Sequence, residues 1–175
     1  SLRSPGVRAN YASIGGKSPL LDWTGKQAIG AARILGSHFK PYVVMRYWHP
    51  RAEEVLSQVR QAGIEQAVVL SMYPHYTGAT TGSSIKDFEL AAQKVYPRLA
   101  YSVVQEWYDW PAYLDSLANR VREGLEKFHE LTRDEIVILF SAHALPQSFI
   151  DRGDPYRDHV LSTVQGVMER LDGNP

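Results

Sequence analysis

A chain of 175 residues with 44% hydrophobic residues is long enough to bury one core, and it falls within the usual size of a single domain. Nineteen basic and nineteen acidic residues give a formal net charge of zero, which argues against a nucleic-acid binder. The absence of cysteine excludes disulfides and thiolate chemistry within the chain. No apolar run approaches a length of about 20 residues, which is what a helix needs to span a bilayer. We therefore expect a soluble, cytoplasmic chain.

Two kinds of segment alternate along the chain: stretches with apolar residues at helical spacing, and short runs of β-branched and aromatic residues. In chain order they predict a helix at 19–35, a strand at 42–48, a helix at 52–59, a strand at 66–72, a helix at 81–95, a strand at 99–104, a helix at 114–128, a strand at 135–141 and a helix at 160–171. The continuous hydrophobicity of the strands predicts burial on both faces. The alternation predicts an α/β fold, a Rossmann-like parallel sheet with flanking helices.

Histidines follow three of the predicted strands, at His49, His75 and His143. Because ligands bind beyond the carboxyl ends of parallel strands, we expect the three imidazoles at one edge of the sheet. His143 is the strongest candidate, since Leu145-Pro146 delays the next helix and leaves the ring at the strand end. A near-neutral imidazole can accept a proton or bind a divalent metal, but a structural, hydrogen-bonded histidine is the alternative at each position.

Small and hydroxylated residues fill the segment TGATTGSS at 77–84, which leads into a predicted helix. Backbone amides in such a segment can bind an anion or the carboxylate side arms of an organic ligand. The segment lacks both the Gly-Lys-Ser/Thr ending of a P-loop and GxGxxG spacing, so helix capping is the stronger interpretation. RGDPY at 152–156 is interpreted as a structural turn before the last helix.

Aromatic residues gather at RYW, 46–48, and at EWYDWP, 106–111. Large planar side chains beside a cleft favour a flat ligand. The alternative is that they fill the core or its rim, which is the commoner use of Trp and Tyr.

Five motifs of this sequence, taken in order, resemble the ferrochelatase family. They are IGGKSPL at 14–20, MRYWHP at 45–50, YPHY at 73–76 with TTGSS at 80–84, FSAHALP at 140–146 and GDPY at 153–156. The resemblance covers essentially the whole chain, and FSAHALP followed by GDPY is its most specific part. It implies one of the family's two similar Rossmann-like domains: residues 1–175 would be a single partial N-terminal domain, without the first strand and the C-terminal domain.

The resemblance also implies roles for individual residues. His143 matches the family's catalytic histidine, which takes pyrrole protons, binds metal, or does both. His75 is implied as a second metal contact, at a position where other members carry glutamine. The residues implied near the porphyrin are Ser18, Arg46, Tyr47, Thr80, Thr81, Ser83, Ser84 and Trp110.

The implied activity is insertion of ferrous iron into a porphyrin, protoporphyrin IX or coproporphyrin III, with removal of two pyrrole protons. Iron is then a substrate, no cofactor is required, and the partners are the porphyrin and iron, with no nucleic acid. The resemblance leaves room for peripheral membrane association of the full protein. We expect the chain alone to be inactive, and the alternative function is a porphyrin- or metal-binding fragment without turnover.

Overall fold

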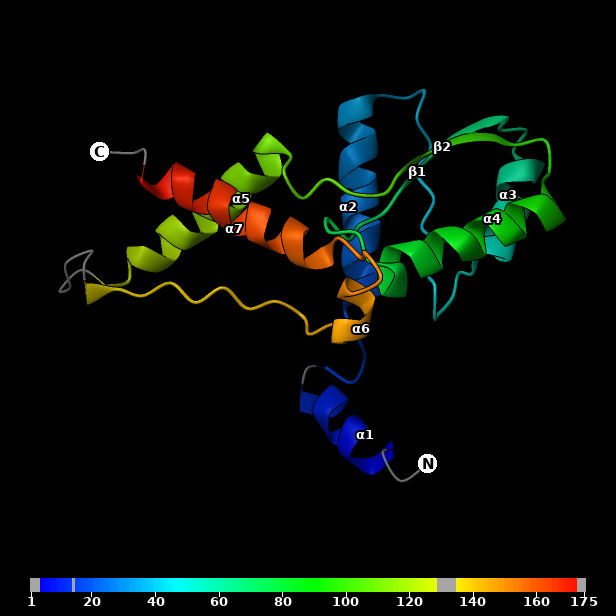
Figure 1. Cartoon of the computed structure of the whole chain (residues 1–175). Coiled ribbons are helices and arrows are strands. Elements are labelled where there is room, and N and C mark those ends of the chain that lie inside the picture. Colours follow the sequence, from blue (N-terminus) through cyan, green and yellow to red (C-terminus); the bar gives the residue numbers. More distant parts are fainter. Residues whose placement is uncertain (1–3, 14, 129–134, 173–175) are drawn as a thin grey trace. The chain divides into compact units, whose positions relative to one another are not determined.

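The computed structural model describes residues 4–13, 15–128 and 135–172 (Figure 1). Its elements are helices α1 (Ser4–Ser13), α2 (Leu20–Leu35) and α3 (Ala52–Gln61), strand β1 (Gln66–Leu70), the single π-helical turn η1 (Gly78–Gly82), helix α4 (Ser83–Val95), strand β2 (Ala100–Val104) and helices α5 (Pro111–Leu125), α6 (Gln147–Ile150) and α7 (Tyr156–Asp172). The chain forms two compact units, and α4 begins in one and continues in the other. Unit 1 contains Ser1–Glu65 with Asp87–Leu99, and unit 2 contains Gln66–Lys86 with Ala100–Pro175.

In unit 1, α3 buries the face that the sequence predicts. Its apolar residues Ala52, Val55, Leu56 and Val59 lie at i, i+3, i+4 and i+7, and all four are buried. Two polar contacts join this helix to α4, which buries residues of its own. The guanidinium of Arg60 donates to the Val95 carbonyl at 3.2 Å, and the Lys94 ammonium lies 2.9 Å from the Glu53 carboxylate.

In unit 2, β1 and β2 form a two-stranded parallel sheet. Gln66 pairs with Ala100 at one end of the register and Leu70 with Val104 at the other, which confirms the α/β prediction of a parallel sheet. The prediction that both strand faces are buried is wrong, because Val68 and Leu70 are 63% and 51% exposed. Continuous hydrophobicity in a strand indicates a preference for burial, but burial also requires a layer of side chains packed against each face of the sheet.

A second pair of elements in unit 2 packs closely, namely α5 and α7 (Figure 1). Their core consists of Leu114, Ala118 and Val167, of which the last two are fully buried. The helices approach closely at Gly166, where an added Cβ would lie 2.7 Å from Cδ1 of Leu114. Arg170 of α7 contacts the Asp115 carboxylate of α5 at 2.6 Å. This packing explains why both helices follow the predicted apolar stripes.

We expect Val167→Ala to lower the free energy of unfolding by about 2 kcal/mol, because it removes two methyl groups from a fully buried site and leaves a cavity. Chemical denaturation of the complete gene product measures the loss. Leu161→Ala is the control, since Leu161 lies on the same helix but is 58% exposed, and it should cost less than about 0.5 kcal/mol. Equal losses in the two variants would contradict the core assignment.

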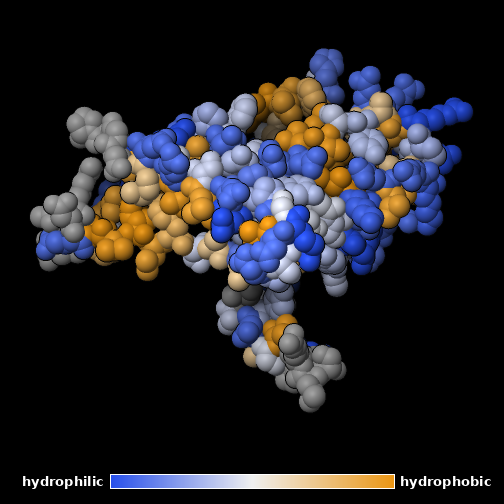
Figure 2. Space-filling model, viewed as in Figure 1, coloured by the Kyte–Doolittle hydropathy of each residue, from blue (hydrophilic) through white to orange (hydrophobic). Residues whose placement is uncertain are grey.

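Two predicted strands are absent from the described residues. Residues 42–48 form a loop in which the Met45 amide donates to the Pro50 carbonyl at 2.8 Å, and residues 136–141 are extended but unpaired. Val137 and Leu139 are 81% and 88% exposed, and Figure 2 shows an apolar surface over this stretch. The strand predictions at 42–48 and 135–141 are therefore wrong for this structure. A β-strand requires backbone hydrogen bonds to a neighbouring strand. The described sheet contains no strand that pairs with either segment.

The predicted helices are confirmed, with α2, α3, α4, α5 and α7 beginning and ending close to the expected positions. The sequence did not indicate α1, which carries no apolar stripe, or α6, a single short turn after Pro146. Among the residues that the structure describes, no helix is both long enough and apolar enough to cross a bilayer.

Candidate functional site

The predicted site residues are divided between the two units. Unit 1 contains Ser18, Arg46 and Tyr47, and unit 2 contains His75, Trp110, His143 and the hydroxyl residues of 80–84. The expectation that His49, His75 and His143 share one sheet edge fails in the described structure, because only His75 follows a strand there. The segments before His49 and His143 are not strands, for the reason given above.

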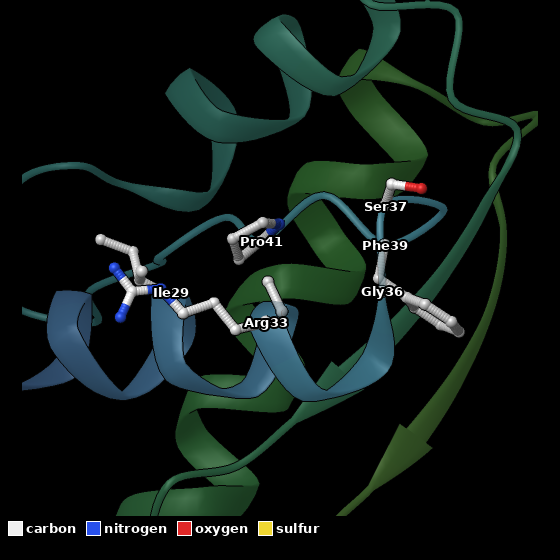
Figure 3. A pocket seen from close by; sticks show the side chains of 7 residues that line it. Ile29, Arg33, Gly36, Ser37, Phe39 and Pro41 are labelled. Carbon is white, nitrogen blue, oxygen red and sulfur yellow. The ribbon is translucent and has the colours of Figure 1, made fainter.

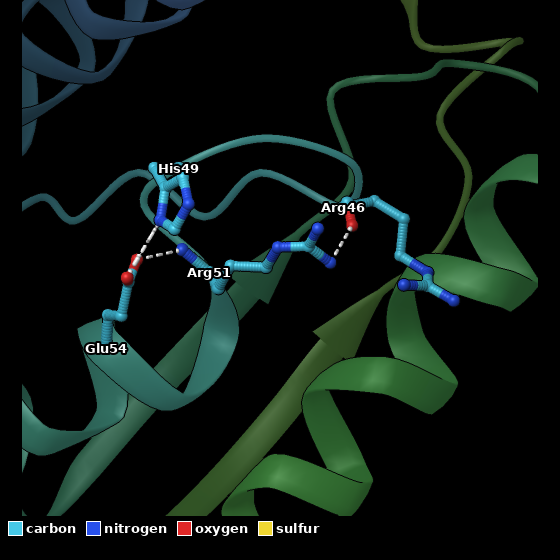
Figure 4. Close-up of polar contacts among 4 residues, drawn as sticks. All are labelled: Arg46, His49, Arg51 and Glu54. Atoms are coloured by element: carbon cyan, nitrogen blue, oxygen red, sulfur yellow. Dashed lines mark hydrogen bonds and ion pairs between the residues drawn. The ribbon is translucent and has the colours of Figure 1, made fainter.

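In unit 1, Arg46 is fixed by contacts on both its backbone and its side chain (Figure 4). Its carbonyl accepts from the Arg51 guanidinium at 3.2 Å, and its own guanidinium lies 3.2 Å from the Asp87 carboxylate. The guanidinium carbon also lies 4.9 Å from the ring centroid of Tyr47, a side chain that is 71% exposed. Arg46 and Tyr47 therefore form a polar and aromatic surface beside α4, in which the Asp87 carboxylate balances the charge of the guanidinium.

The start of α3 holds this loop in place. The carboxylate of Glu54 accepts the Arg51 backbone N–H at 2.6 Å, and it lies 2.8 Å from Nδ1 of His49 (Figure 4). The hydrogen bonds from Arg51 and His49 lower the pKa of Glu54. His49 is thus a structural residue at a helix N-terminus, which was the alternative interpretation for each strand-end histidine.

The other site residue of unit 1, Ser18, precedes α2. Its exposed hydroxyl oxygen accepts the Leu20 backbone N–H at 3.3 Å. Ile14, the first residue of the IGGKSPL motif, lies outside the described residues.

His75 lies in an aromatic cluster of unit 2. Its Nε2 atom is 2.9 Å from the Thr163 hydroxyl of α7, its ring stacks with Tyr108, and it contacts Tyr113 and Tyr156 edge-on. Burial lowers the pKa of His75, which favours the neutral ring at neutral pH. A neutral imidazole can act as a metal ligand or a proton acceptor.

His159, which sequence reasoning did not select, is the second histidine of this cluster. It is 7% exposed, and its Nδ1 atom accepts the Tyr76 backbone N–H at 3.3 Å. Its Nε2 atom lies 3.7 Å from the Glu106 carboxylate, and its ring stacks on Tyr108 with centroids 3.8 Å apart. The sequence feature that could have identified His159 is its four-residue spacing from Thr163, and that of Thr163 from Val167. This spacing places a polar pair on the buried face of α7.

The hydroxyl residues of 77–84 form η1 and the first turn of α4. Thr81 is fully buried, and its hydroxyl lies 3.1 Å from that of Ser71 after β1, while Thr80, Ser83 and Ser84 are half-buried. Thr77 caps the turn by accepting the Ala79 N–H at 3.3 Å. This arrangement agrees with the capping interpretation of the segment. The role of these residues in porphyrin binding stays a prediction.

Asp154 of the GDPY motif joins two loops of unit 2. Its carboxylate accepts the Thr77 hydroxyl and the Gly78 N–H, each at 2.8 Å, and the Tyr156 N–H at 3.1 Å. Burial opposes ionisation of Asp154, but the hydrogen bonds outweigh it and lower its pKa. The predicted structural role of GDPY is confirmed, because Asp154 caps α7 and anchors the loop that follows His75.

His143 and Trp110 are the most accessible predicted residues of unit 2. His143 is exposed, and none of the residues that the structure describes donates a hydrogen bond to its ring or accepts one from it. Trp110 is 63% exposed and directly precedes α5. The described part of the chain contains no group of three or more histidine, aspartate or glutamate side chains that could hold a metal ion. Metal binding by His143 and His75 therefore stays a prediction.

A shallow apolar hollow of about 410 Å³ lies elsewhere in unit 1, between the end of α2 and the loop that follows (Figure 3). It is lined by Ile29, Ala32, Arg33, Gly36, Ser37, Phe39 and Pro41. None of the predicted site residues lines it, so it provides no support for the predicted chemistry.

Comparison with known proteins connects these residues to one family. The family model of ferrochelatase matches residues 1–175. The chain is 46% identical to a ferrochelatase of Geotalea uraniireducens, over 97% of this chain and 52% of that protein, and 43% identical to one of Geobacter metallireducens, over 98% and 53%. It is 37% identical to a mitochondrial ferrochelatase of Gallus gallus, over 99% of this chain and 45% of that protein. The chain spans about half the length of these curated relatives, and over that span it belongs to the ferrochelatase family.

Proposed function

We propose that the complete protein is a ferrochelatase, which inserts ferrous iron into a porphyrin and removes two pyrrole protons. The observation that carries this proposal is the family match over residues 1–175, which includes both the FSAHALP and the GDPY motifs. Because the chain spans about half the length of its relatives, the reaction is assigned to the complete protein. Residues 1–175 are assigned to its N-terminal domain.

Iron enters this reaction as a substrate, and His143 supplies the proton acceptor. The exposure of its ring supports this role, because none of the described residues hydrogen-bonds either nitrogen. The unprotonated nitrogen can take one pyrrole proton at a time and release it to solvent, or it can bind the metal. His75 is the second metal contact, supported by its neutral ring. The porphyrin-binding residues are Ser18, Arg46, Tyr47, Thr80, Thr81, Ser83, Ser84 and Trp110.

Binding energy from the porphyrin's side arms drives the chemistry at its centre. Distorting the flat macrocycle turns the pyrrole lone pairs toward the entering metal and exposes the N–H protons, and exclusion of water strengthens the interactions at the reacting atoms. Arg46, whose charge is balanced by Asp87, provides guanidinium N–H donors for a propionate side arm, and the exposed rings of Tyr47 and Trp110 provide flat apolar contact. The proposal includes no cofactor and no nucleic-acid partner. It assigns the complete protein to the cytoplasm, where peripheral membrane association is compatible with the proposed reaction.

Binding without turnover is the second candidate, and it applies to the 175-residue chain alone. It is favoured by the length comparison, since relatives named ferrochelatase are about twice as long.

The test is iron insertion under anaerobic conditions, with protoporphyrin IX and coproporphyrin III offered separately to the complete gene product and to the chain alone. We expect the complete gene product to metallate one of the two porphyrins, and the chain to bind porphyrin without metallating it. A folded complete protein that metallates neither would overturn the proposed function. Turnover by the chain would overturn the assignment of the reaction to the complete protein.

A further inference from the structure

The hydroxyl group of Thr163 bridges two partners in unit 2, and it has only one proton to give. It donates that proton to the Tyr108 carbonyl at 2.8 Å, because a carbonyl oxygen can only accept. Toward Nε2 of His75, 2.9 Å away, the hydroxyl oxygen is left as an acceptor. The proton in the second contact must therefore belong to Nε2 of His75.

A neutral imidazole carries one N–H, so protonation at Nε2 leaves Nδ1 of His75 with a free lone pair. The half-buried ring lies among Tyr108, Tyr113 and Tyr156, and burial of this kind lowers the pKa of His75 and favours its neutral form. Nδ1 has no hydrogen-bond partner among the described residues, and no fully buried side-chain nitrogen or oxygen there lacks one. Nδ1 consequently reaches solvent, while Nε2 faces the protein.

The surrounding contacts keep Thr163 in this arrangement. Thr163 is 6% exposed, one helical turn after His159 on the same face of α7. The ring of Tyr108, whose carbonyl takes the Thr163 proton, stacks on His159. The Tyr76 N–H donates to Nδ1 of His159, which gives His159 the same Nε2–H tautomer as His75. Each hydrogen bond in this network is satisfied by only one placement of the protons.

We propose that Thr163 is a positioning residue that fixes His75 as its Nε2–H tautomer, so that Nδ1 is the atom that contacts the divalent metal substrate. The metal half of this inference rests on the proposed function, whereas the tautomer half rests only on the hydrogen-bond network. A histidine that binds metal through one nitrogen normally donates its other N–H to a fixed acceptor, and here that acceptor is the Thr163 hydroxyl.

The tautomer is measured by nitrogen-15 NMR of histidine-labelled complete gene product, with the His75 signals assigned from their loss in His75→Gln. We expect an unprotonated Nδ1 and a protonated Nε2 in the wild type. Thr163→Val removes the acceptor at nearly constant volume and should give a mixture of tautomers, whereas Thr163→Ser keeps the hydroxyl and should match the wild type. A wild-type Nδ1–H, or a Val variant with the wild-type spectrum, would overturn the positioning role.

The metal half is tested with Zn²⁺, a diamagnetic divalent probe that accepts imidazole ligands. On titration we expect the Nδ1 signal of His75 to move while the Nε2–H signal persists. Thr163→Val should bind Zn²⁺ about 10- to 100-fold more weakly at His75, and Thr163→Ser should bind as the wild type does. Zn²⁺ coordination at Nε2, or no response of His75, would overturn the metal half and leave the tautomer result intact. If the complete gene product fails to insert iron, neither NMR result changes. A failure of the proposed function is therefore distinguishable from a failure of this inference.

Discussion

His143→Ala is expected to reduce iron insertion by the complete gene product by about 100-fold or more, with porphyrin binding retained. Removal of a proton-transfer group from a reacting centre typically costs about 10²- to 10⁴-fold in rate. Binding should survive because the exposed imidazole makes no hydrogen bond with the residues that the structure describes, so its loss leaves the local fold unchanged. Anaerobic insertion assays measure the rate, and quenching of tryptophan fluorescence measures porphyrin binding.

His38→Ala is the control for nonspecific loss of an exposed imidazole, since His38 lies in the loop after α2 and belongs to no predicted site. It should leave both the rate and the binding unchanged. Insertion by His143→Ala at close to the wild-type rate would show that His143 is not the proton acceptor. Loss of porphyrin binding together with insertion would make it a binding residue instead.

Local periodicity was sufficient to predict helices α2, α3, α4, α5 and α7. The four apolar residues of α3 that recur at helical spacing are its four buried residues, and the stripe of α5 contributes Leu114 and Ala118 to the core with α7. Each of these patterns spans fewer than about four turns, so it depends on residues close in sequence. The same reasoning located β1 and β2 within one or two residues of their bounds.

Features that depend on distant residues could not be predicted from one sequence. Residues 42–48 and 136–141 have the composition of strands, but a strand also needs a hydrogen-bonded neighbour that composition does not specify. His75 and Thr163 are 88 residues apart, and Thr77 and Asp154 are 77 apart. Nothing in the local sequence of α7 identifies the loop after β1 as its partner. The order of the five motifs identified the family, which periodicity alone did not, but it indicated neither of these contacts.

Asp154→Asn is expected to destabilise the junction between the 77–78 loop and the start of α7 by about 2–3 kcal/mol. One carboxylate oxygen accepts from both Thr77 and Gly78, and the other accepts from the Tyr156 amide. An asparagine has a single acceptor oxygen, so its NH₂ group must face a donor on one side. Three charge-assisted bonds would sum to more, but Asp154 is only half-buried and solvent screens the charge.

Hydrogen exchange at the Gly78 and Tyr156 amides of the complete gene product reports this loss directly. We expect about 100-fold faster exchange in Asp154→Asn at neutral pH if these amides exchange through local opening. Asp151→Asn is the matched control, because it removes the same charge three residues away. Among the described residues, the Asp151 carboxylate hydrogen-bonds only the Gln147 side chain at the start of α6. Exchange at both amides should then be unchanged. Equal acceleration by the two substitutions would assign the effect to net charge.

The contribution of Asp154 should also depend on pH, in a direction set by its lowered pKa. Burial raises this pKa, but the bonds from Gly78, Thr77 and Tyr156 outweigh burial, so the folded protein holds a proton on Asp154 less tightly than the unfolded chain does. The carboxylate's stabilisation is therefore complete above the unfolded pKa of about 3.9, and it is lost as the pH falls through the lower, folded value. Protection factors of wild type and Asp154→Asn should differ at pH 7, and the difference should shrink only below about pH 3.9 and disappear once the pH is below the folded pKa of Asp154. If the difference in protection factors persists unchanged at acidic pH, the protection of these amides depends on the shape of the Asp154 side chain and not on its charge.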